Sequence, residues 1–191
     1  MLEYSTIYSA ALMGTFEEFL KKFNEEDQYY ETARTDNLLY TALRNADETA
    51  RYEIANFLIS KGADVKVVTE DGESLFFPLF SYIGKDIEKT TILCKRLLEK
   101  GADITVLDKK HRIACFWSLF GKEIIHIPEI ELMSLYQLIF SQPGLPLLIE
   151  NNWGMTVIDL ARQSYRETAV KMMEDYLKKP KWRWYSKIFR K

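Results

Sequence analysis

The sequence predicts an all-α protein built from repeated helical units. Two blocks carry this prediction, FLISKGADVK at 57–66 and RLLEKGADIT at 96–105, which match each other with a shift of 39 residues. Each block ends a stretch in which apolar residues recur at the spacing of one helix face. In both blocks a Lys precedes a Gly, and this pair is a helix stop because a cation suits the negative end of the helix and Gly adopts positive φ without steric cost. A helix, a glycine stop and a short extended segment therefore repeat as a unit.

We expect helices over 52–59 and 91–98, a last helix over about 165–178, and five units within one domain, residues 1–179. The units lie near 4–33, 34–66, 67–105, 106–150 and 151–179. A single helix pair leaves a hydrophobic face open, whereas stacked pairs bury it. Small residues that allow close helix approach stand at Ala10, Ala11, Ala42 and Ala55.

The two end units must present polar side chains to water. In the first unit we expect this of Glu17, Glu18, Lys21 and Lys22. In the last helix we expect it of Arg166, Glu167, Lys171, Glu174 and Asp175.

Further motifs repeat around the two blocks. Residues 152–161 (NWGMTVIDLA) have a G-x-T-x-x-D-L-A pattern, Asp71–Phe76 follows the first block as a turn, and segments 5–14 and 37–43 open two more units. On these motifs the chain resembles the ankyrin-repeat family over about residues 4–178. The resemblance implies an ankyrin-repeat solenoid, a stack of helix-turn-helix units with short hairpin-like tips.

The chain departs from that family in several ways. The blocks are 39 residues apart instead of about 33, and the extra residues fall near 45–51, 81–90 and 120–130. The family's Pro is missing from every turn, and a Pro-rich segment, 141–149, replaces one hairpin. Short, divergent chains of this kind resemble bacterial members of the family.

Composition excludes several classes of protein. No apolar run reaches about 18 residues, so we expect no membrane-spanning helix, and the N-terminus has no secretory pattern. Two cysteines, Cys94 and Cys115, are too few for a disulfide framework. We therefore expect a cytoplasmic protein in which both thiols are reduced, buried and inert.

Catalytic and cofactor motifs are missing as well. The chain has only two histidines, and we expect His111 at an exposed hairpin tip and His126 in an irregular insertion. No spacing places a third group beside either one, so we expect no catalytic residues. No C-x-x-C, H-x-x-x-H or glycine-rich phosphate motif occurs, so we expect no metal site and no cofactor. The protein is therefore expected not to be an enzyme.

Charge is unevenly distributed. Residues 178–191 hold seven of the 26 Lys and Arg and no acid, which leaves 19 bases against 28 acids in the rest of the chain. An acidic body attracts a basic partner and repels nucleic acid, so we expect no nucleic-acid partner. The simpler interpretation is that like charge keeps the surface soluble.

The expected binding surface is formed by the tips and first helices. From the register, the tips fall near 68–72, 107–111 and 151–154. Trp153 at a tip is either a binding anchor or packed on the neighbouring tip, and Tyr82 and Trp117 either reach the inner surface or lie in the core. Candidate partner-binding residues are Glu70, Asp71, Tyr82, Asp108, Lys109, His111, Trp117, Asn151, Asn152 and Trp153.

The C-terminal tail, 180–191, is basic and aromatic. It is interpreted as a short helix that closes the stack, as an anchor for an anionic membrane surface, or as a segment that stacks on nucleic acid. The residues for capping or membrane contact are Lys181, Trp182, Arg183, Trp184 and Phe189.

These observations favour a non-catalytic protein-protein interaction module that is a monomer by itself. A rigid, largely acidic concave surface would bind another protein with little conformational cost. The ankyrin resemblance implies an alternative, an immunity protein that neutralises a secreted bacterial toxin by covering its active site. A second alternative is a membrane-recruited scaffold that uses the basic-aromatic tail.

Overall fold

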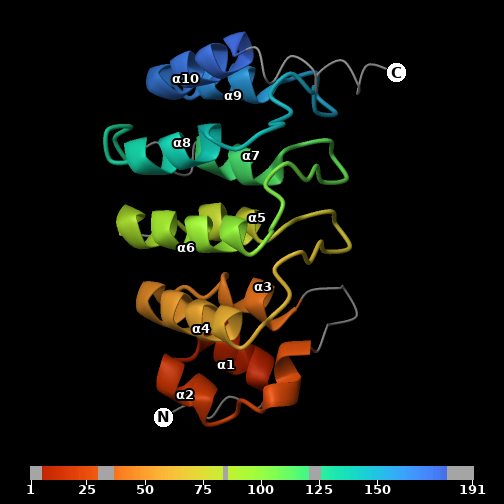
Figure 1. Ribbon diagram of the computed structural model, residues 1–191, viewed down its shortest axis with the longest axis vertical. Helices are drawn as coiled ribbons and strands as arrows, with labels where there is room; N and C mark the ends of the chain where they lie inside the picture. Colours follow the sequence, from red (N-terminus) through yellow and green to blue (C-terminus); the bar gives the residue numbers. More distant parts are fainter. Residues whose placement is uncertain (1–5, 30–36, 84–85, 121–125, 180–191) are drawn as a thin grey trace.

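The structure is a computed structural model that describes residues 6–29, 37–83, 86–120 and 126–179. Within these ranges the chain is all-helical, with ten α-helices, one 3-10 helix and no β-strand. The prediction of an all-α protein is confirmed. Figure 1 shows the helices in successive layers along the long axis of the molecule, from the N-terminal layer to the C-terminal one.

Each layer is a pair of helices. The pairs are α1 (Ile7–Met13) with α2 (Phe16–Leu20), α3 (Leu38–Ala42) with α4 (Glu48–Ser60), α5 (Phe76–Ser81) with α6 (Ile87–Glu99), α7 (Ala114–Phe120) with α8 (Met133–Phe140), and α9 (Val157–Gln163) with α10 (Glu167–Lys178). The 3-10 helix, Glu25–Tyr29, follows the first pair. First helices contact first helices of the next layer, as α5 does α7, and second helices do the same, as α6 does α8.

The helices end where the glycine stops were expected. Gly62 and Gly101 follow α4 and α6 with φ of +91° and +93°. After α4, the amide of Ala63 donates to the carbonyl of Leu58 over 3.0 Å, and the bond after α6 has the same form and length. These bonds satisfy carbonyls that the helix end leaves unpaired, so the repeated Lys-Gly pair does terminate two helices.

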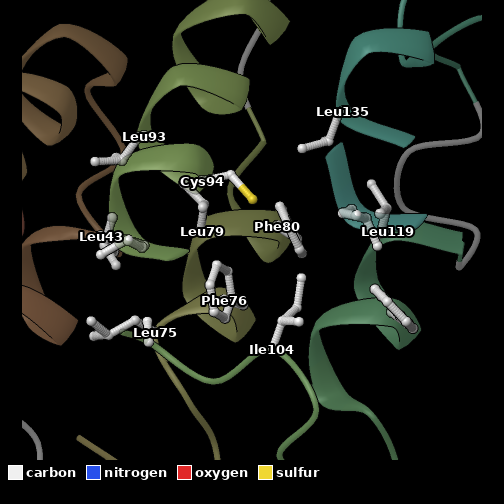
Figure 2. Close-up of a cluster of buried hydrophobic side chains, with 14 of the residues drawn as sticks. Leu43, Leu75, Phe76, Leu79, Phe80, Leu93, Cys94, Ile104, Leu119 and Leu135 are labelled. Atoms are coloured by element: carbon white, nitrogen blue, oxygen red, sulfur yellow. The ribbon is translucent and has the colours of Figure 1, made fainter. Parts of the chain in front are cut away.

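Buried side chains from neighbouring layers form one continuous core. Figure 2 shows Leu79 and Phe80 of α5 lying near Cys94 of α6, with Leu119 and Leu135 of the next layer opposite. The four alanines expected at close helix contacts, Ala10, Ala11, Ala42 and Ala55, are all buried. The Cys94 thiol is fully buried, as expected, and burial raises its pKa far above the ordinary value. The side chain of Cys115 lies outside the part of the chain that the structure describes.

One expectation for the last helix is wrong. Glu167, Lys171, Glu174 and Asp175 are exposed as expected, but Arg166 is only 3% exposed. Its guanidinium donates to the carbonyl of Ile127 in the preceding layer over 2.7 Å. Arg166 therefore joins two layers instead of facing water. No helix in the described ranges has the length and apolar character needed to cross a bilayer.

Candidate functional site

Three loops of identical hydrogen-bonding pattern project from the stack just before α5, α7 and α9. We call them the acidic tip (69–73, TEDGE), the basic tip (108–112, DKKHR) and the aromatic tip (151–155, NNWGM). In each, the first residue's amide donates to the carbonyl of the fifth, and the fourth residue's amide donates to the carbonyl of the first. The fourth residues are Gly72, His111 and Gly154, and all three have positive φ. The prediction that His111 lies at an exposed tip is confirmed.

Neighbouring tips are joined to one another. The amide of Lys109 donates to the carbonyl of Asp71 over 3.1 Å, and the amide of Asn152 donates to the carbonyl of Lys110 over 3.2 Å. A Cβ placed on Gly72 would lie only 3.0 Å from the Cα of Asp108. The three tips therefore form one continuous, closely packed edge, which we call the tip edge; Figure 1 shows these loops on one side of the stack.

Two of the expected partner-binding residues are buried, and each stabilises the loop of its own tip. Asp108 is 5% exposed; its carboxylate accepts from the amides of Lys110 and Arg112 and pairs with the Arg112 guanidinium. Asn151 is 7% exposed, and its Oδ1 accepts from the amides of Trp153 and Met155. The expectation that Asp108 and Asn151 lie on the open surface is therefore wrong. Both side chains are buried, and their oxygens accept hydrogen bonds from backbone amides of their own loops.

Beside the acidic tip lies an open pocket of about 280 Å³. Its walls come from α3 and the turn that follows it, the acidic tip, and α5 with the residue that follows it. The lining residues are Tyr40, Arg44, Thr69, Glu70, Asp71, Glu73, Phe77, Pro78, Ser81 and Tyr82. Three carboxylates and one guanidinium make the lining mainly acidic. Glu70 and Asp71 are exposed, and Tyr82 is 40% exposed. The pocket thus brings together three of the residues that the sequence predicted for partner binding.

Glu73 is the half-buried acid of this pocket. The Tyr40 hydroxyl donates to its carboxylate over 2.6 Å. Burial raises the pKa of the Glu73 carboxyl above its ordinary value, the hydrogen bond from Tyr40 opposes that rise, and the nearby charge of Asp71 adds to it. The raised pKa means that the charged carboxylate lacks full compensation, so a cation entering the pocket would stabilise it.

Two aromatic rings and two cations lie close together at the basic tip, the aromatic tip and α7. The rings of Trp117 and Trp153 lie 5.8 Å apart, centroid to centroid. The Arg112 guanidinium lies over the Trp117 ring at 5.6 Å, and the Lys110 ammonium lies over the Trp153 ring at 5.9 Å. Trp153 remains 59% exposed. Trp153 therefore packs on Trp117 of α7 and still presents its ring to solvent, and its role as a binding anchor stays a prediction.

The structure adds residues to the site that the sequence did not single out. Tyr40 and Glu73 shape the pocket, and Lys110 and Arg112 flank the tryptophans. The tip expected near 107–111 already contains Lys110 and ends one residue before Arg112, but the sequence carries no signal that Tyr40 reaches Glu73. The expected tail residues, 181–184 and 189, lie outside the described ranges.

Metal-binding groups do not converge in the described part of the chain, where no three His, Cys, Asp or Glu side chains are arranged to hold an ion. His126 is exposed in the segment that precedes α8. The site is an open, mixed polar and aromatic surface on a rigid edge, which suits contact with another molecule.

These features define an all-helical protein of stacked helix pairs with one projecting edge of loops. No family model matches the chain, and no curated protein matches it. Among solved structures, the chain is similar to a functionally unknown protein from Leptotrichia buccalis C-1013-b. The two are 46% identical, the match covers 92% of this chain and 94% of that chain, and the TM-score is 0.78. The chain therefore belongs to the same family as that protein.

Proposed function

We propose that the chain is a divergent ankyrin-repeat solenoid that binds another protein through the tip edge and the pocket beside the acidic tip, and that it catalyses no reaction. Three features support the ankyrin assignment. The helix pairs stack in register, Gly62 and Gly101 end equivalent helices, and the three tips share one hydrogen-bonding pattern. In the described ranges, the principal contacts of each unit are within the unit or with its neighbours, which is the arrangement of repeat proteins.

The observation that carries the proposed function is the pocket in which Glu70, Asp71, Glu73 and Tyr82 converge. The pocket is open to solvent and is built on backbone that hydrogen bonds fix in place. A surface formed in advance binds with little loss of conformational entropy. Its acidic lining and the half-buried Glu73 favour a partner that presents a Lys or Arg side chain.

The narrower alternative, an immunity protein, is one form of this proposal, because a basic toxin domain would present such side chains. A pull-down from a cell extract tests both the general proposal and the immunity-protein form of it. It would identify the partner, and a toxin among the specific partners would favour the narrower one.

The proposal is tested with the full-length chain immobilised and exposed to an extract of the cells that produce it. A variant carrying Glu70→Lys and Asp71→Lys reverses two exposed charges of the pocket. A matched control, Glu53→Lys with Glu167→Lys, makes the same change on α4 and α10, away from the tip edge. We expect the wild type and the control to retain the same proteins, and the pocket variant to lose at least tenfold of a specific subset, as measured by quantitative mass spectrometry.

Salt gives a second measurement in the same experiment. Contacts between exposed charges weaken as ionic strength rises, so the subset lost by the pocket variant should also elute first with salt. If the pocket variant and the control retain identical sets of proteins, the pocket is not the binding site and the proposal is wrong.

A further inference from the structure

Equivalent positions on the three tips carry different chemistry. The second and third residues of each tip are, in order along the stack, Glu70 and Asp71, then Lys109 and Lys110, then Asn152 and Trp153. All six are exposed. Because the three loops have the same backbone hydrogen bonds, these side chains follow one another along the edge as an acidic, a basic and an aromatic position.

The aromatic position is held ready for contact. The Asn151 Oδ1 accepts from the amide of Trp153, which fixes the turn, and the Trp117 ring supports the indole from one side. Tryptophan side chains on rigid backbone supply large contact area at low entropic cost, and they are enriched among the residues that dominate binding energy. Trp153 is thus the side chain on this edge best suited to anchor a partner.

Spacing limits what could bind all three tips. Packed helices lie about 8–10 Å apart, so successive layers, and the tips they carry, follow at about that interval. An extended chain in the polyproline II conformation advances about 3.1 Å per residue with three residues per turn, so every third side chain lies on the same face. About three residues of an extended segment therefore separate the groups that face successive tips.

We propose that the tip edge binds an extended segment of the partner that presents a basic side chain, an acidic side chain and an aromatic or aliphatic side chain in that order along the stack, about three residues apart. This inference rests on the proposed function and adds the chemistry and direction of the bound segment. The two charged positions of opposite sign fix the direction, because a segment bound in reverse would place like charges together. Such repulsion supplies specificity, whereas the contact with Trp153 supplies affinity.

A phage-displayed library of random 12-residue peptides tests the inference on the immobilised full-length chain. We expect enriched peptides to share a base, an acid and a large apolar residue spaced by about three positions. Lys109→Glu with Lys110→Glu should replace the preferred acid by a base and leave the base that faces the acidic tip unchanged. Trp153→Ala should abolish the apolar preference and keep both charges, with a loss of at least tenfold in affinity for the wild-type peptides.

A matched control, Lys95→Glu with Lys171→Glu, makes the same charge change on α6 and α10 and should select the wild-type consensus. Circular dichroism checks that every variant is folded. Enriched peptides without an acidic position, or with one that persists in the Lys109→Glu, Lys110→Glu variant, would overturn the inference. A wild-type selection that enriches no peptide also overturns it, while the pull-down above decides the proposed function independently.

Discussion

Gly72 lies where the acidic and basic tips touch, and it has two reasons to be glycine. Its φ is +81°, and a Cβ there would meet the Cα of Asp108 at 3.0 Å. Gly62 shares only the first reason, because its φ is +91° and nothing lies within 4 Å of an added Cβ. The two glycines therefore separate backbone strain from crowding between tips.

We expect Gly62→Ala to lower the free energy of unfolding by about 1 kcal/mol, the cost of a left-handed conformation for a residue with a Cβ. Gly72→Ala should cost about 2 kcal/mol or more, since overpacking adds to the same strain. Urea denaturation followed by circular dichroism measures both. Equal losses in the two variants would show that the tips are not packed closely at Gly72.

Residue types alone did not distinguish an exposed tip residue from a buried one. Asp108 and Asn151 are polar residues in turns, which is the usual pattern of a solvated loop, and this led to the expectation that they face a partner. In the structure their side-chain oxygens accept hydrogen bonds from backbone amides of the same loop. Asp and Asn are well suited to this role. Lys109 and Trp153, one and two residues further along their tips, carry no such bond from the side chain and remain exposed.

At the scale of elements, the G-x-T-x-x-D motif has a local physical meaning. Thr156 and Asp159 form a capping box at the start of α9, in which the Thr156 hydroxyl accepts from the Asp159 amide and the Asp159 carboxylate accepts from the Thr156 amide. Helix ends and starts of this kind are predictable from sequence because both partners lie within one turn.

Contacts between layers are not predictable in the same way. Glu129 caps α10 from the preceding layer, accepting from the amides of Thr168 and Ala169 over 3.0 and 2.9 Å. Glu48 accepts from the amide of Asp86 at the start of α6 in the same manner. About 40 residues separate these partners, so no local pattern reveals them, and the buried Arg166 was missed for the same reason.

We expect Thr156→Ala to lower the free energy of unfolding by about 1 kcal/mol at pH 7, since it removes the cap of α9. The effect should depend on pH. The hydrogen bonds from Thr156 hold the pKa of Asp159 below its ordinary value of 3.8, so their contribution is present above about pH 4 and is lost as pH falls through the lowered pKa. The penalty should therefore shrink toward pH 2.

Denaturant titrations of wild type and variant at pH 7 and pH 2 give the comparison. Thr168→Ala is a matched control, because this half-buried threonine lies in the first turn of α10 and its amide is capped by Glu129, not by its own hydroxyl. A penalty for Thr156→Ala that is the same at both pH values would contradict the role assigned to Asp159.

The whole molecule is a one-dimensional stack, since the principal contacts of each layer are made within the layer or with the next one. The repeat itself was evident from the two Gly-Ala-Asp blocks, which predicted helical units that stack on one another. The pocket was not evident, because it depends on α3, α5 and the acidic tip meeting across a layer boundary. The stability of such a stack is the sum of the intrinsic stability of each unit and of the interfaces between neighbouring units. A substitution that destabilises an end layer should therefore increase local unfolding only near that end.

Phe19 and Met173 test this at opposite ends. Phe19 of α2 is fully buried, with its ring 6.1 Å from that of Phe57 in the next layer, and Met173 of α10 is fully buried in the last layer. Truncating such side chains costs about 2–5 kcal/mol. By native-state hydrogen exchange, we expect Phe19→Ala to accelerate exchange in α1–α4 and leave α8–α10 unchanged, and Met173→Ala to do the reverse. Uniform acceleration along the whole chain in either variant would show that the stack unfolds as a single block.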